Sequence, residues 1–190
     1  MKKIVIIGAT GSLVPYVAEA LLKLDNIQLT LFARSPKYID KNLTDKCTII
    51  QGDALEYESI KKVVAGQDVV YVNLTGNLEA MAKNIVKAMH EEGVNKVIAI
   101  SSIGIYKTPL KPILRPYRAL ADSIEASGLD YTILRPNWFT NGSEIDYHIT
   151  HKPDPEIGGS LSRRGIANFV AKVVANPEQY TNVNVGISKI

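Results

Sequence analysis

The sequence predicts an α/β protein with a Rossmann-like, doubly wound parallel sheet in a single domain. Short apolar runs alternate along the chain with longer stretches whose apolar residues recur at helical spacing. The first apolar run, residues 4–7, leads directly into the turn Gly8-Ala9-Thr10-Gly11. A chain of 190 residues also suits one hydrophobic core better than two. Together these observations favour strands joined by crossover helices.

The expected elements follow from this alternation. Strands are expected at residues 3–7, 27–33, 47–51, 68–74, 96–101, 131–134 and 183–187. Helices are expected at residues 12–24, 56–64, 78–92, 117–126 and 162–175. Residues 136–160 contain several Pro and Gly residues, and we expect an irregular loop on the substrate side of one domain covering residues 1–190.

Composition narrows the class of protein. The chain is 46% hydrophobic and 22% charged, its formal net charge is +3, and its basic residues form no block. We therefore expect a soluble protein that binds neither nucleic acid nor membrane. The early apolar run is too short for a signal-peptide core, and Cys47 is the only cysteine, so we expect a cytoplasmic location.

The glycine turn is typical of a pyrophosphate site. Gly8 permits a tight turn, Gly11 permits close approach of backbone, and the following helix offers free N–H groups to an anion. Pro15 fits a first helical turn. A purely structural turn is the alternative. Val14 stands where a third glycine often lies, so we expect it to push the helix outward or to be absorbed by small neighbours.

The second strand predicts the cofactor. Arg34 lies where an NAD site would carry Asp or Glu, and a guanidinium pairs well with the 2′-phosphate of NADP. We therefore expect NADP(H) in preference to NAD(H), although a simple surface arginine remains possible. Asp53 is expected to accept from the adenine amino group. The expected cofactor-binding residues are Gly8, Thr10, Gly11, Ser12, Leu13, Arg34, Ser35, Asp53, Ala54, Asn73, Leu74, Thr75, Gly76, Ser101, Arg135 and Pro136.

Several segments carry a family resemblance. The sequence resembles the atypical short-chain dehydrogenase/reductases of the NmrA-like, NAD(P)H-binding group, in its segments 8–11, 33–35, 52–53, 101–102, 127–136 and 161–163. The stretch Ser-Gly-Leu-Asp-Tyr-Thr-Ile-Leu-Arg-Pro at 127–136 is the most specific of these. The resemblance implies a Rossmann-like fold and NADP(H) binding. It implies diverse roles: reduction of quinones, flavins or bilins, sugar-nucleotide-like chemistry, or non-catalytic redox sensing.

The expected catalytic residues are incomplete. Ser102 resembles a catalytic serine that orients a carbonyl, but neither Tyr106 nor Tyr117 has a lysine four residues later to lower its pKa. Arg118 is an imperfect substitute for that lysine. The predicted catalytic set is therefore Ser102, Tyr117 and Arg118.

The acceptor is expected to be small and planar. Quinones, flavins and bilins accept a hydride readily and can take a proton from water, so positioning alone can suffice. The expected substrate-binding residues are Tyr106, Trp138 and Phe139. The adjacent aromatics could instead anchor a loop in the core.

A metal site is not expected. Asp146, His148, His151 and Asp154 fall in the segment expected to be irregular, where nothing fixes a ligand geometry, so we interpret them as rim residues.

Two functions remain open. The first is an NADP(H)-dependent oxidoreductase acting on a small-molecule acceptor. The second is a non-catalytic NADP(H)-binding sensor with a regulatory protein partner. A homodimer is possible with either.

Overall fold

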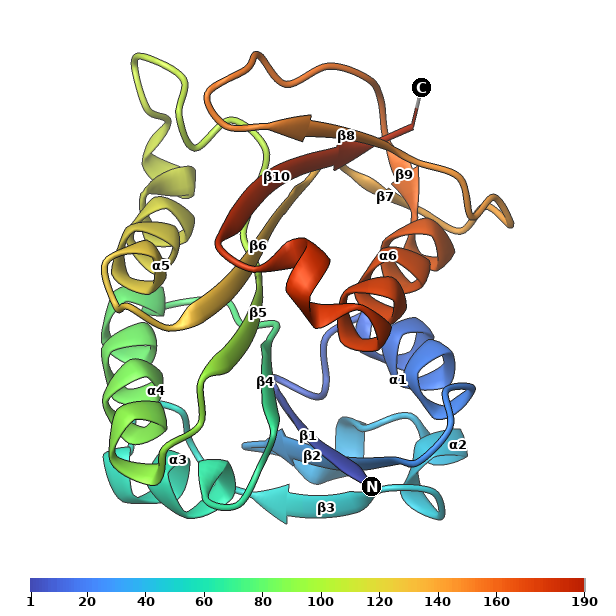
Figure 1. Ribbon diagram of the computed structural model, residues 1–190, viewed down its shortest axis with the longest axis vertical. Coiled ribbons are helices and arrows are strands. Elements are labelled where there is room, and N and C mark those ends of the chain that lie inside the picture. The colour runs from blue at the N-terminus through green and yellow to red at the C-terminus, as the bar shows by residue number, and fades with distance from the viewer. Residues whose placement is uncertain (190) are drawn as a thin grey trace.

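A parallel sheet forms the centre of the molecule in the computed structural model, which describes residues 1–189 (Figure 1). The strand order is β3-β2-β1-β4-β5-β6-β10-β8, and only the last pairing is antiparallel. These strands are β1 (Lys2–Ile7), β2 (Ile27–Ala33), β3 (Thr48–Gln51), β4 (Val69–Val72), β5 (Lys96–Ile100), β6 (Asp130–Pro136), β8 (His148–His151) and β10 (Val183–Ser188). The predicted α/β fold class is confirmed.

Helices cover both faces of the sheet. One face packs against α1 (Val14–Leu22) and α6 (Arg163–Ala175), and the other against α3 (Tyr57–Val64), α4 (Leu78–Glu92) and α5 (Arg115–Glu125) (Figure 1). A short helix, α2 (Lys41–Thr44), and three 3₁₀ turns, Pro36–Tyr38, Pro112–Leu114 and Pro177–Tyr180, complete the helical elements.

The alternating side chains of β1 explain why the sheet has two cores. Ile4 and Ile6 point into the core beneath α1 and α6, whereas Val5 and Ile7 point into the core beneath α3, α4 and α5. All four are fully buried. A strand buried on both faces must be apolar at every position, which is the continuous run that the sequence shows.

The predicted irregular segment is more ordered than expected. Between residues 136 and 160 the chain forms β7 (Phe139–Thr140) and the edge strand β8. β7 pairs with β9 (Leu161–Ser162) in a second, two-stranded sheet, and β8 pairs with β10. Sequence periodicity missed both strands because they are short and depend on partners far along the chain. Within residues 1–189, no helix is long and apolar enough to cross a membrane.

Candidate functional site

A large cleft runs along the carboxyl ends of the strands, where ligands of open α/β sheets bind. Its volume is about 890 Å³, within the range of small-molecule sites. Predicted residues lining it are Gly8, Thr10, Gly11, Ser12, Leu13, Arg34, Ser35, Asp53, Ala54, Asn73, Leu74, Thr75, Ser101, Ser102, Tyr117, Pro136, Trp138 and Phe139. The topology therefore brings most of the predicted site to one place.

The glycine turn is held in a fixed shape with donors left over. The N–H groups of Gly8 and Ala9 both donate to the carbonyl of Phe32 at 3.1 Å. The N–H groups of Thr10, Ser12 and Leu13 have no protein acceptor among residues 1–189. Together with the N-terminus of α1, these free donors fit a pyrophosphate.

Glycine is required at Gly8 and Gly11 because of Asn73. Gly8 has φ +94°, and a Cβ atom there would overlap the backbone carbonyl of Asn73. A Cβ atom on Gly11 would overlap the side-chain amide of Asn73. The two missing side chains thus make room for Asn73, the residue after β4, as well as for a ligand.

Val14 is accommodated without disturbing this turn. Its side chain is fully buried in the core beneath α1 and α6, and its N–H donates to the carbonyl of Gly11 at 3.0 Å. The helix begins at Val14, two residues later than predicted, with Pro15 in its first turn. Of the two outcomes expected, the structure shows absorption into the core.

Arg34 lies at one end of the cleft. Its side chain is 72% exposed, and Nη1 lies 4.0 Å from Oδ2 of Asp53. Oδ1 of Asp53 accepts from the N–H of Leu55 at 2.9 Å, which holds the carboxylate in place. Arg34 is therefore loosely tethered, with donors free to meet a phosphate. The exposed ring of Tyr38 lines the same end.

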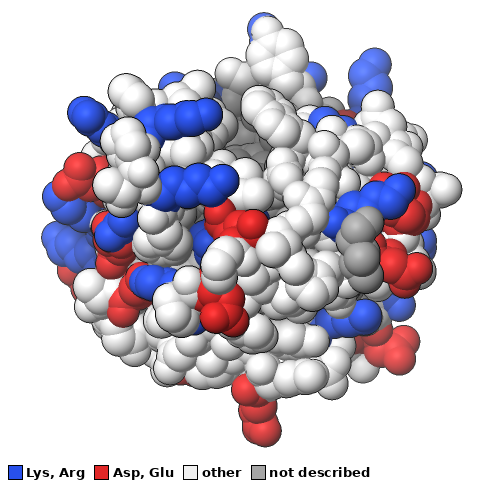
Figure 2. All heavy atoms as spheres, turned by 90° about the horizontal axis from the view of Figure 1, so that it is seen from above, with Lys and Arg blue, Asp and Glu red and all other residues white. Residues whose placement is uncertain are grey.

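The other end of the cleft is apolar, with a few polar groups. Trp138 is 81% exposed, and the exposed Ile113 lines the same region. Ser101 fixes the start of α5, because its hydroxyl donates to the carbonyl of Tyr117 at 3.0 Å. Lys111 also lines this region. In the face seen in Figure 2, a broad uncharged area lies between groups of basic and acidic side chains.

Four predicted residues do not line the cleft, and these assignments are corrected. They are Gly76, Tyr106, Arg118 and Arg135. Arg135, expected to bind cofactor, is only 2% exposed; Nη1 pairs with Glu156, and Nε donates to Oδ1 of Asn184 at 2.8 Å. Arg118, the expected catalytic substitute for lysine, donates from Nε to Asp122 at 2.7 Å. Gly76 supplies a left-handed turn after β4, with φ +97°.

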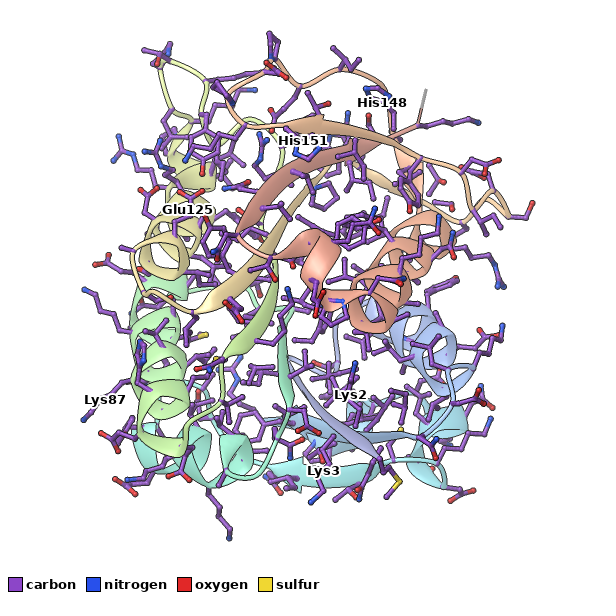
Figure 3. The ribbon with its side chains drawn as sticks, in the orientation of Figure 1. Lys2, Lys3, Lys87, Glu125, His148 and His151 are labelled. Atoms are coloured by element: carbon purple, nitrogen blue, oxygen red, sulfur yellow. The ribbon has the colours of Figure 1, made fainter. Side chains whose placement is uncertain are left out.

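Tyr106 belongs to a polar network on the α5 face of the sheet. Its hydroxyl accepts from Nδ2 of Asn184 at 2.8 Å, and Nδ2 also donates to Glu125. Glu125 lies at the end of α5 and accepts from Lys152 at 2.9 Å (Figure 3). Nζ of Lys152 lies 4.5 Å from the centroid of the Tyr106 ring. A Tyr–Lys pair therefore exists in space, but outside the cleft.

The pKa of Tyr106 agrees with a structural role. Burial, and next the charge of Glu125, raise the pKa of its phenol, despite the opposing effect of Lys152. A catalytic phenol would need the opposite shift to release a proton near neutral pH. The prediction that Tyr106 binds substrate is wrong because its side chain does not line the cleft.

The histidines of the predicted rim lie on the sheet edge. His148 and His151 are at the two ends of β8 (Figure 3). Within residues 1–189, no group of three or more His, Cys, Asp or Glu side chains could hold a metal ion.

Sequence reasoning missed several residues at the site. Tyr38, Met81, Lys111, Ile113 and Asn137 also line the cleft. Lys111 does not fit the expected spacing of a lysine four residues after a tyrosine, because it precedes Tyr117 and is separated from α5 by a 3₁₀ turn. Only the fold brings Tyr38 and Met81, from two different connections, to the same cleft.

This fold and cleft define a Rossmann-like, dinucleotide-binding protein. The chain belongs to the NAD(P)H-binding family, whose model matches residues 8–177. It is similar to a Rossmann-fold NAD(P)-binding family protein from Shigella flexneri, with 39% identity, a TM-score of 0.90, and coverage of 100% of this chain and 94% of that one.

Two further proteins are similar to this chain. A short-chain dehydrogenase/reductase from Veillonella parvula, in complex with NADP, has 23% identity and a TM-score of 0.88, covering 99% of this chain and 94% of that one. An isoflavone reductase homolog A622-like protein from Nicotiana tabacum is 30% identical over 152 residues, which cover 73% of this chain. The match covers 49% of that relative, so the chain spans about half the length of the curated relatives it matches.

Proposed function

We propose that the protein is an NADP(H)-dependent oxidoreductase that reduces a small planar acceptor. One observation carries the proposal: the glycine turn and Arg34 lie at one end of the same cleft that has Ser102, Tyr117 and Trp138 at its other end. A dinucleotide spanning the cleft would place its nicotinamide against the apolar end. The name of the Nicotiana relative and the NADP complex of the Veillonella structure support this proposal.

The residues present fit the cofactor. Gly8 and Gly11 leave backbone open at the turn, and the free N–H groups of Thr10, Ser12 and Leu13 would hold the pyrophosphate. Arg34 would pair with the 2′-phosphate, because a guanidinium is a strong donor to phosphate oxygens. This pairing is the basis for preferring NADP(H) to NAD(H).

The chain's own contribution to catalysis would be positioning. When bound, the reduced cofactor supplies a hydride, and the proton that completes reduction comes from water. Trp138 and Phe139 would stack against a flat acceptor, and Ile113 would limit water on the other side. The hydroxyl of Ser102, which donates to the carbonyl of Ile103 at 3.2 Å, would turn to donate to an acceptor oxygen. Quinone-, flavin- and bilin-like acceptors need no stronger acid than this.

A second candidate function is a non-catalytic NADP(H) sensor that binds a regulatory protein. It is favoured by the position four residues after Tyr117, which is the buried Ala121 rather than lysine. A sensor would bind NADP(H) through the same glycine turn and Arg34 but would catalyse no reaction.

Steady-state NADPH oxidation distinguishes the two candidates. The purified protein would be assayed against benzoquinones, naphthoquinones, riboflavin, FMN, biliverdin and aliphatic aldehydes. We expect turnover with planar acceptors and little with aldehydes. Absence of turnover with every acceptor, together with NADP(H) binding by calorimetry, would favour the sensor.

A further inference from the structure

Arg163 contacts both the glycine turn and the segment that follows Phe139. It is the first residue of α6, and its Nε and Nη2 atoms lie 3.4 and 3.3 Å from Oγ of Ser12 in the glycine turn. Its Nη1 atom donates to the carbonyl of Thr140 at 3.2 Å and to Oδ1 of Asn141 at 2.8 Å. One guanidinium therefore contacts both the cofactor turn and the segment that follows Trp138 and Phe139.

Among residues 1–189, no acidic side chain forms an ion pair with Arg163, since no carboxylate lies within 4 Å of its guanidinium. The partners it does have, at Ser12, Thr140 and Asn141, are all neutral. A half-buried arginine that is held beside a phosphate-binding turn and lacks an anionic partner is suited to attract the pyrophosphate.

The acceptor wall is attached to the same residue. The guanidinium carbon of Arg163 lies 5.4 Å from the centroid of the Phe139 ring. Phe139 pairs with Leu161 between β7 and β9, and the N–H of Leu161 donates to the carbonyl of Trp138 at 2.9 Å. A movement of Arg163 would therefore be transmitted to Trp138 through two packed residues.

The base of Arg163 is rigid. Ser162 is fully buried, and its Oγ accepts from the N–H of Gly165 at 2.9 Å, which caps α6. The same hydroxyl donates to the carbonyl of Glu144. The backbone at Arg163 is fixed, so the freedom of this residue is confined to its side chain, between Ser12 and the wall.

We propose that Arg163 is a positioning residue that couples pyrophosphate at the glycine turn to the order of the Trp138–Phe139 wall. A pyrophosphate at Ser12 would fix the fork of the guanidinium by charge-assisted hydrogen bonds, and the fixed fork would hold Thr140, Asn141 and Phe139. Such coupling requires the ligand to favour the ordered state over the loose one. The proposal rests on the dinucleotide binding in the proposed function, but not on turnover.

Trp138 provides a direct readout. It is the only tryptophan in the chain and is 81% exposed, so its fluorescence reports on the wall alone. The probe is 2′-phospho-ADP-ribose, which carries the pyrophosphate but has no nicotinamide to contact the indole. Adenosine 2′-monophosphate, which lacks the pyrophosphate, is the matched control ligand. We expect the first compound, and not the second, to reduce acrylamide quenching of Trp138.

Variants test whether Arg163 carries this effect. Arg163→Gln should abolish the reduction in quenching and weaken binding of 2′-phospho-ADP-ribose on the order of tenfold, as expected for the loss of a charged donor. Its binding of adenosine 2′-monophosphate should not change. Arg163→Lys should recover part of the affinity but not the quenching effect, because an ammonium lacks the planar fork. Ser12→Ala should also lose the quenching effect.

Arg164 is the matched control on the same helix. It is exposed, and its guanidinium lies over the ring of Tyr16 rather than beside Ser12. Arg164→Gln should behave like the unaltered protein. Equal loss in Arg164→Gln, or full protection of Trp138 in correctly folded Arg163→Gln or Arg163→Lys, overturns the proposal.

The coupling and the proposed function fail in different ways. If 2′-phospho-ADP-ribose binds without protecting Trp138, the coupling is wrong and the oxidoreductase proposal stands. If protection is present but no acceptor is reduced, the coupling stands and the oxidoreductase proposal is wrong.

Discussion

The side-chain amide of Asn73 occupies the space that a Cβ atom on Gly11 would take. Asn73 directly follows β4, and its N–H donates to the carbonyl of Ile7, the last residue of β1, at 2.9 Å. The glycine turn is therefore shaped by a neighbouring strand as well as by its own sequence. Gly11 must lack a side chain because of the Asn73 amide, whereas Gly8 must lack one because of the Asn73 backbone. The two requirements can therefore be tested separately.

Gly11→Ala should weaken NADP(H) binding, because the new methyl group would displace the Asn73 amide into the cleft. Asn73→Ala should relieve the overlap, so the penalty of Gly11→Ala should be much smaller in that background. Gly8→Ala provides the contrast, since it meets the backbone of Asn73 and has φ +94°. Calorimetry would measure NADP(H) affinity for each glycine variant with and without Asn73→Ala. If Asn73→Ala restored affinity equally to Gly11→Ala and Gly8→Ala, the expectation would be contradicted.

Arg34→Ala should remove most of the preference for NADP(H) over NAD(H). A charge-assisted contact contributes roughly 1.5–3 kcal/mol, which corresponds to a preference on the order of tenfold to a hundredfold. Dissociation constants of both cofactors, measured by calorimetry, check the expectation. Lys41→Ala, on α2 and outside the cleft, is the control. Equal affinities for NADP(H) and NAD(H) in the unaltered protein would show that Arg34 does not discriminate between the two cofactors.

Tyr117→Phe should lower the rate of reduction only a few-fold, because no lysine four residues later prepares its phenol to donate a proton. Loss of a true general acid costs roughly 10²–10⁴. Trp138→Ala should mainly raise KM for the acceptor, since a stacking surface sets position. Steady-state kinetics with a quinone separate kcat from KM. A thousandfold fall in kcat for Tyr117→Phe, with cofactor affinity intact, would restore a conventional proton relay.

Val14→Gly should destabilise the protein without tightening cofactor binding. The valine is fully buried, so its loss leaves a cavity and adds the helix penalty of glycine, together roughly 2–4 kcal/mol. Urea unfolding and calorimetry measure the two effects separately. Tighter binding in the variant would mean that the valine does hold α1 away from the turn.

Lys96 should make stability depend on pH. It is buried at the start of β5, where Nζ donates to Oγ1 of Thr132 at 3.0 Å, and burial lowers its pKa below the ordinary value. Between the lowered pKa and the ordinary pKa of about 10.4, the unfolded chain binds more protons than the folded protein. The contribution of Lys96 to the free energy of unfolding therefore rises with pH across that window.

Lys96→Met isolates this contribution. Relative to the variant, the unaltered protein should gain stability as pH rises through the window, in urea unfolding between neutral pH and pH 10. The exposed Lys46→Met is the control, and it should leave the pH profile unchanged. Parallel profiles for the Lys96 variant and the unaltered protein would show that its ammonium is not destabilised by burial.

The sequence by itself determined the fold class and the end of the cleft that the glycine turn and Arg34 line. Both depend on local patterns: apolar runs that must be buried on two faces, a Gly-x-x-Gly turn between strand and helix, and Arg34 at the end of β2. Each of these signals lies within a few residues of the element it predicts. Chain order then places them together, because parallel strands end at the same edge of the sheet.

Only the tertiary structure decided which side chains reach the cleft at the end that Trp138 lines. Arg135 and Ile133 share one face of β6, and that face packs against α5 and its polar network instead of opening toward the ligand. Lys111 lines the cleft, and Arg163 contacts Ser12 of the glycine turn from a segment about 50 residues further along the chain. No local sequence pattern predicts such long-range contacts, because they depend on how separate elements pack on the sheet.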